Sequence, residues 1–118
     1  MDSIERIQRV MDGLPDSFLP DKAAGIAAVL LFRFTGRENL SWVVRIAGGR
    51  CSVERGEVEG ATLTLEAPAD VYDTILNGKI MASMALSRGK IRLSGDLSLA
   101  PRVATWFKLP GGMRLSLL

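Results

Sequence analysis

Histidine is absent from this chain of 118 residues. Its absence removes the usual general base, the usual partner of a serine or cysteine nucleophile, and the commonest zinc ligand. An enzyme built on this chain would have to use carboxylates, lysines or a thiol. The sequence therefore predicts no catalytic residue, no metal site and no cofactor.

Cysteine is nearly absent too, since Cys51 is the only one, and an internal disulfide is excluded. The first residues, Met1-Asp2-Ser3, are followed by charges and do not resemble a secretory leader. The longest apolar run, residues 23–32, is too short to span a bilayer. We therefore expect a cytoplasmic protein.

Aromatic residues are few and basic residues form no run. Domains that bind nucleic acid cluster lysine and arginine with aromatics between them, so no nucleic-acid partner is predicted. The formal charge of +2 still permits a transient contact with an anionic membrane. Four basic residues lie close together in the sequence for such a contact: Lys79, Arg88, Lys90 and Arg92.

The apolar content of 47% is enough for the core of one domain over residues 1–118, without a linker or repeat. Asp2 and Glu5 are placed to cap an amphipathic helix that ends near Gly13 and Pro15. Residues 15–21 are predicted to be a loop, and residues 20–24 a single helical turn.

The middle of the chain has the pattern of strands. Apolar runs and alternation predict strands over residues 26–35, 40–46, 50–55 and 62–66, with a tight turn at Gly48-Gly49. Helices are expected over 68–77, 81–87 and 97–109, with a fifth strand over 90–94 between the last two. This order predicts an α+β domain with helices on one face of a mostly antiparallel sheet.

The stretch from residue 77 to residue 109 has more large, soft apolar residues than a small core needs. Met81 and Met84 could line an apolar cavity, or they could be plain core. Trp106 could be a core anchor, or it could lie at a cavity mouth with its indole N–H toward water. The alternation of Met113, Leu115 and Leu117 predicts that the C-terminal tail, residues 110–118, docks on the body.

Six segments of the sequence together resemble the sterol carrier protein type 2 family, in the family's order and over roughly residues 22–109. They are Pro20–Gly25, Ser41–Val44, Gly48–Arg50, Ala61–Leu65, Leu76–Lys79 and Gly89–Asp96. The resemblance implies a five-stranded sheet covered on one face by helices, with an apolar tunnel between them. It also implies binding and carriage of a fatty acyl, sterol-like or isoprenoid lipid without catalysis.

On that resemblance, the tunnel wall would be apolar residues from the second half of the chain, with the tail from Met113 as a candidate lid. The predicted lipid-binding residues are Leu76, Ile80, Met81, Met84, Leu97, Leu99, Val103, Trp106, Phe107 and Met113. The chain departs from the family in Pro101 and in the bulky Trp106-Phe107 pair, which could narrow or fill the tunnel.

Two other functions remain open. The chain could be an accessory or scaffold protein that presents a hydrophobic substrate, such as a quinone precursor, to partner enzymes. An enzyme would have only Glu57, Glu59 and Cys51 as candidates, and these are better explained as an exposed turn and a buried, inert thiol. The sequence leaves the oligomeric state and the identity of the lipid open.

Overall fold

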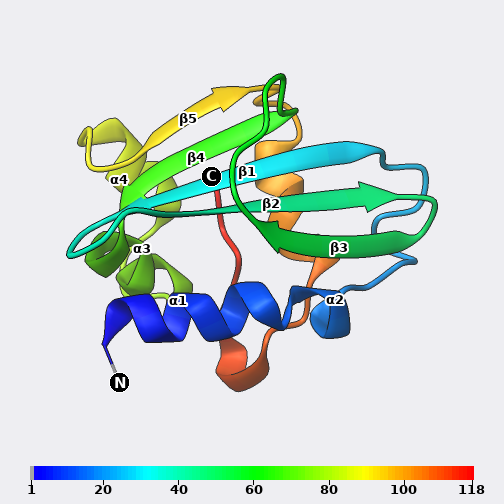
Figure 1. The fold of residues 1–118 in the computed structure, drawn as a ribbon. Helices are drawn as coiled ribbons and strands as arrows, with labels where there is room; N and C mark the ends of the chain where they lie inside the picture. Colours follow the sequence, from blue (N-terminus) through cyan, green and yellow to red (C-terminus); the bar gives the residue numbers. More distant parts are fainter. Residues whose placement is uncertain (1) are drawn as a thin grey trace.

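Five strands form one sheet in the computed structural model, which describes residues 2–118 (Figure 1). The strands are β1 (Ala28–Thr35), β2 (Leu40–Ala47), β3 (Arg50–Arg55), β4 (Leu63–Pro68) and β5 (Arg92–Gly95). Their order is β3-β2-β1-β4-β5; β1 and β4 run parallel, and the other neighbours are antiparallel. The predicted five-stranded, mostly antiparallel sheet is confirmed.

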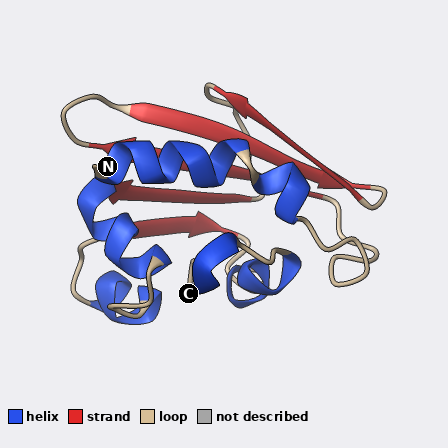
Figure 2. Cartoon of the chain, turned by 90° about the horizontal axis from the view of Figure 1, so that it is seen from below, coloured by secondary structure: helices blue, strands red, loops and turns tan. Residues whose placement is uncertain are grey.

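The helices gather along one side of this sheet (Figure 2). They are α1 (Ser3–Asp12), α2 (Leu14–Ser17), α3 (Ala69–Leu76), α4 (Ala82–Ser87) and the 3₁₀ helices η1 (Ala100–Trp106) and η2 (Pro110–Gly112). Helix α1 begins as predicted, because the Asp2 side chain accepts a hydrogen bond from the Glu5 N–H at 2.9 Å. The predicted α+β class is therefore confirmed.

Two local predictions are wrong. The loop expected over residues 15–21 contains helix α2, because Pro15 lies in the first turn, where its missing N–H is tolerated. The last helix is not an α-helix over 97–109 but the shorter η1. Pro101 lies in its first turn, and Arg102 N donates to Leu99 O, three residues back, as in a 3₁₀ helix. The single turn predicted over residues 20–24 is present as a hydrogen-bonded turn, in which Ala23 N donates to Leu19 O.

The two faces of the sheet are covered differently. Leu30, Phe32 and Trp42 belong to the apolar cluster shared with the helices, whereas Leu31 and Val43 are buried outside that cluster. Leu31 and Val43 are register partners on β1 and β2, and the β3–β4 connection crosses that face (Figure 1). The main core thus lies between the sheet and the helices.

The C-terminal tail enters this core. Leu115 and Leu117 are 0% and 1% exposed and belong to the main apolar cluster, while residues 113–118 have no helix or strand. The chain ends among the helices on one side of the sheet (Figure 2), where Leu118 is 41% exposed. The prediction that the tail docks on the body is confirmed, and it docks in the interior.

Candidate functional site

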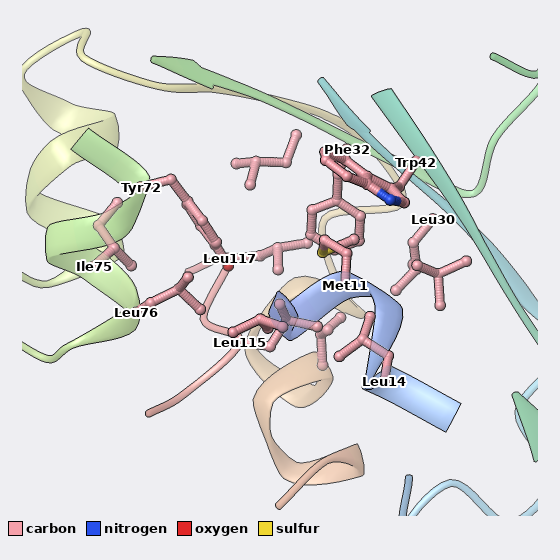
Figure 3. Packing of buried hydrophobic residues seen from close by; sticks show 14 of the residues in the cluster. Met11, Leu14, Leu30, Phe32, Trp42, Tyr72, Ile75, Leu76, Leu115 and Leu117 are labelled. Carbon is pink, nitrogen blue, oxygen red and sulfur yellow. The ribbon is translucent and has the colours of Figure 1, made fainter. Parts of the chain in front are cut away.

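The space between the sheet and the helices, where the tunnel is expected, is occupied by the tail. In the close-up, Leu115 and Leu117 appear between Tyr72 and Leu76 on one side and Met11 and Leu14 on the other (Figure 3). These side chains come from α1, α2 and α3, so the tail runs between the helices that cover the sheet. One side of the extended tail, with Leu115 and Leu117, is therefore buried in the core, while Arg114 and Leu118 are exposed.

Two hydrogen bonds attach the tail to α3. Tyr72 Oη donates to Ser116 O at 2.9 Å, and Arg114 N donates to Leu76 O at 3.0 Å. Tyr72 is fully buried, and burial raises the pKa of its phenol well above the ordinary value. The hydroxyl is therefore a permanent hydrogen-bond donor aimed at the tail.

Helices α1 and α3 are joined beside the tail by a buried carboxylate. Arg6 donates from Nε to Asp73 Oδ1 at 2.8 Å and from Nη2 to Asp73 Oδ2 at 2.5 Å. Ser3 Oγ also donates to Asp73, at 3.3 Å. The hydrogen-bonded Arg6 guanidinium holds the pKa of Asp73 below its usual range. This ion pair fixes the spacing of the two helices that flank the tail.

Two pockets border the tail and the turn that precedes it. One, of about 460 Å³, lies between α1 and the turn at residues 109–113, and Val10, Leu109 and Met113 give it apolar walls. The other, of about 250 Å³, lies between α3, the start of α4 and the tail. Both pockets therefore lie beside the segment that carries Leu115 and Leu117.

The ten predicted lipid-binding residues do not line one common cavity. Leu76, Ile80 and Met81 come together at the second pocket, and Met113 lines the first. Phe107 and Met113 also line a third pocket, of about 740 Å³, at residues 104–114. The others divide between core and surface: Val103, Trp106 and Phe107 are buried, Leu99 is half-buried, and Met84 and Leu97 are exposed. Trp106 is 0% exposed, which makes it a core anchor rather than a mouth residue.

Sequence reasoning missed the residues that surround the tail. Tyr72, Met11 and Leu14 are not among the residues predicted to bind a ligand. The alternation of Leu115 and Leu117 was the one signal for this arrangement. It indicates that the tail docks but says nothing about which elements receive it.

A family model described as the SCP-2 sterol transfer family matches residues 7–108. The chain belongs to the SCP-2 sterol transfer family. Solved structures agree with this assignment at the level of the fold. Sterol carrier protein 2 like 2 from Aedes aegypti is 22% identical, with a TM-score of 0.69 over 83% of this chain and 90% of that one. Sterol carrier protein 2 from Yarrowia lipolytica, in its apo form, is 19% identical, with a TM-score of 0.63 over 79% of both chains.

Curated SCP-2 relatives are longer than this chain. Hydroxysteroid dehydrogenase-like protein 2 from Pongo abelii is 27% identical over 86 residues, which cover 72% of this chain and 21% of that protein. Human sterol carrier protein 2 is 26% identical over 94 residues, covering 80% of this chain and 17% of that protein. This SCP-2 chain spans about a fifth of the length of these relatives.

Two of the candidate enzymatic groups of this SCP-2 chain, Glu57 and Cys51, lie in surroundings that explain them without catalysis. Glu57 accepts hydrogen bonds from Arg33, which lower its pKa, and this pair attaches the β3–β4 connection to the sheet. Burial raises the pKa of Cys51 to about 11, so its thiol is protonated near neutral pH. Within residues 2–118 no cluster of acidic residues and cysteine could hold a metal ion, and no helix is long and apolar enough to cross a bilayer.

Proposed function

We propose that this SCP-2 chain binds a lipid with a long apolar chain between the sheet and the helices, and that the lipid replaces the C-terminal tail. The observation that carries the proposal is the burial of Leu115 and Leu117 in the centre of the fold. A linear apolar segment already lies there between α1, α3 and the sheet. A palmitated relative, SCP2L2 from Aedes aegypti, is 25% identical, with a TM-score of 0.56, and supports an acyl chain as ligand.

The free energies of burial favour such a replacement. Burying a leucine side chain contributes about 1.5 to 3 kcal/mol, so displacing Leu115 and Leu117 costs about 3 to 6 kcal/mol. Each buried methylene of a lipid contributes about 0.8 kcal/mol, so about a dozen contribute about 10 kcal/mol. A long acyl, sterol-like or isoprenoid ligand therefore gains more by burial than the tail loses.

The buried hydroxyl of Tyr72 requires a hydrogen-bond acceptor on the ligand. Its hydroxyl donates to Ser116 O, and removal of that acceptor would leave a buried donor unpaired, which is costly. A ligand with an oxygen acceptor on its apolar body, such as a carboxylate, hydroxyl or carbonyl, restores the bond. The proposed ligand is therefore a lipid of this kind, bound without chemical conversion.

The test is titration with a fluorescent stearate in wild type and in Leu117→Ala. Because Leu117→Ala weakens the docking of the tail, we expect the affinity for stearate to rise about fivefold to tenfold. Leu31→Ala is the matched control, since Leu31 is equally buried but lies outside the main cluster. Equal affinities in the two variants, or no uptake in any of the three proteins, would contradict the proposal.

The length of the relatives favours a second candidate. Because this domain makes up about a fifth of the curated relatives, it could present a hydrophobic substrate, such as a quinone precursor, to partner enzymes in the cytoplasm. Co-purification of a stable partner by a protein that takes up no lipid would favour this scaffold role.

A further inference from the structure

Charge is divided unevenly along this chain. Residues 74–118 contain seven basic residues and one acidic residue, Asp96, whereas residues 1–73 contain twelve acidic and eight basic residues. Each ion pair identified within residues 2–118 joins two residues of the first 73. The basic residues of the last 45 positions are all exposed. Residues 74–118 thus present exposed positive charge that takes part in none of the identified ion pairs.

Much of this charge surrounds helix α4. Lys79 precedes the helix, Arg88 is its C-cap, and Lys90 N donates to Ala85 O at 2.9 Å, which holds Lys90 against the end of the helix. Arg114 lies beside the start of α4, because it lines the same pocket as Met81. A helix of six residues is only about 9 Å long. These four positive charges therefore lie around a single short element.

The nearest acidic residues already have partners. The charge of Lys79 helps to lower the pKa of Asp73, but Asp73 is only 8% exposed, and both of its carboxylate oxygens accept hydrogen bonds from Arg6. Glu66 is the register partner of Arg92 and lines the same pocket as Lys90, and it also lies 3.9 Å from Arg33. None of the ion pairs identified within residues 2–118 includes a basic residue around α4, so these charges remain available to an anionic partner.

Exposed apolar side chains lie among these charges. Met81 and Met84 are 67% and 43% exposed, and Met84 N donates to Met81 O, which places them one helical turn apart. Leu118, 41% exposed, lines the same pocket as Met81. Soft side chains at this exposure contribute little to the core but can enter the apolar edge of a bilayer while lysine and arginine reach the phosphates.

We propose that this region docks on an anionic phospholipid bilayer. The α4 surface consists of Lys79, Met81, Met84, Arg88 and Lys90, and Arg114 and Leu118 join it while the tail is docked. Helix α1 is less suited, because its basic residues Arg6 and Arg9 stand among the acidic residues Asp2, Glu5 and Asp12. The role of this docking rests on the proposed lipid binding. The exposed Met81 and Leu118 border the pocket beside Leu76 and the tail. A lipid that leaves the interior through this pocket would therefore enter the bilayer.

The test is co-sedimentation with vesicles of phosphatidylcholine alone and of phosphatidylcholine with phosphatidylglycerol. Wild type should bind only the anionic vesicles and lose binding in high salt. The variant Lys79→Gln with Lys90→Gln should bind about 30-fold more weakly. The control Lys22→Gln with Arg50→Gln removes two exposed charges without identified ion pairs elsewhere, and should change binding less than twofold.

A second pair of variants tests the apolar contact. Met84→Ser should weaken vesicle binding several-fold, whereas Leu97→Ser, which removes a side chain of similar exposure away from α4, should not. The proposal is overturned if wild type does not bind anionic vesicles at low salt. It is also overturned if both control variants weaken binding as much as the α4 variants.

A vesicle-free measurement separates this proposal from lipid binding itself. The variant Lys79→Gln with Lys90→Gln should take up fluorescent stearate supplied from ethanol with unchanged affinity, but should accept it more slowly from anionic vesicles. Vesicle binding without stearate uptake would support the docking surface and contradict the proposed function. Stearate uptake without vesicle binding would support the proposed function and contradict the docking surface.

Discussion

Tyr72 is the residue through which the core offers a ligand a directional bond. Its buried hydroxyl is held by a carbonyl of the tail. Every other side chain labelled around the tail in Figure 3 is apolar, apart from the indole N–H of Trp42. Because Tyr72 is the side chain that already bonds a carbonyl of the tail, its hydroxyl should favour an oxygen-bearing lipid in place of the tail.

The variant Tyr72→Phe removes this hydroxyl and keeps the ring. We expect the affinity for stearate to fall about fivefold, the value of one hydrogen bond of about 1 kcal/mol. The affinity for diphenylhexatriene, a hydrocarbon probe without oxygen, should not fall. Titration of both probes checks this, and an equal loss for the two would show that Tyr72 contributes only by packing.

Asp73 should make stability depend on pH. Its folded-state pKa is depressed by Arg6, so its stabilising effect is complete above the unfolded pKa of about 3.9 and is lost as the pH falls toward the folded value. Urea unfolding should show wild type losing stability below about pH 4. Asp73→Asn should be less stable at pH 7 and lose less on acidification. Asp21→Asn, at an exposed carboxylate, is the control and should follow wild type.

At the scale of elements, strand β5 ends against a close backbone contact. Gly95 has φ +106°, and a Cβ there would lie 2.2 Å from Thr62 O. This contact explains why position 95 is a glycine in the Gly89–Asp96 segment, which carries part of the family resemblance. A side chain at position 95 must move either strand β5 or the residue before β4.

Gly95→Ala should therefore destabilise the fold by more than about 3 kcal/mol, because the clash adds to the strain of a positive φ. Gly25→Ala is the control: its φ is +77°, but no atom lies within 4 Å of the added Cβ, so only about 1 to 2 kcal/mol is expected. Thermal unfolding of both variants gives the comparison. Equal losses would show that the contact with Thr62 is unimportant.

Local signals predicted most elements. Strand β3 has the predicted bounds, and its tight turn follows from Gly48 and Gly49, whose positive φ values suit a two-residue hairpin. The 3₁₀ geometry of η1 was missed because the apolar spacing of Val103 and Trp106 fits either kind of helix, and Pro101 is tolerated in the first turn of both.

For the whole molecule, the order of helices and strands was sufficient to predict the α+β class, and the family resemblance agreed with it. The position of the tail was not predictable in the same way. The burial of Leu115 and Leu117 depends on contacts with α1 and α3, far away in the sequence, and no periodicity encodes such contacts. For the same reason, sequence reasoning grouped Met84 and Leu97 with the buried Val103, although both are exposed.

The measurement that tests the exchange of tail and lipid most directly is hydrogen exchange of residues 113–118 with and without saturating stearate. The amide of Arg114, which donates to Leu76 O, should be protected in the free protein and exchange faster when lipid is bound. Amides of the central strands β1 and β2 should stay protected in both states. If stearate binds fully and the protection of Arg114 is unchanged or increases, the lipid does not replace the tail, and the central claim is contradicted.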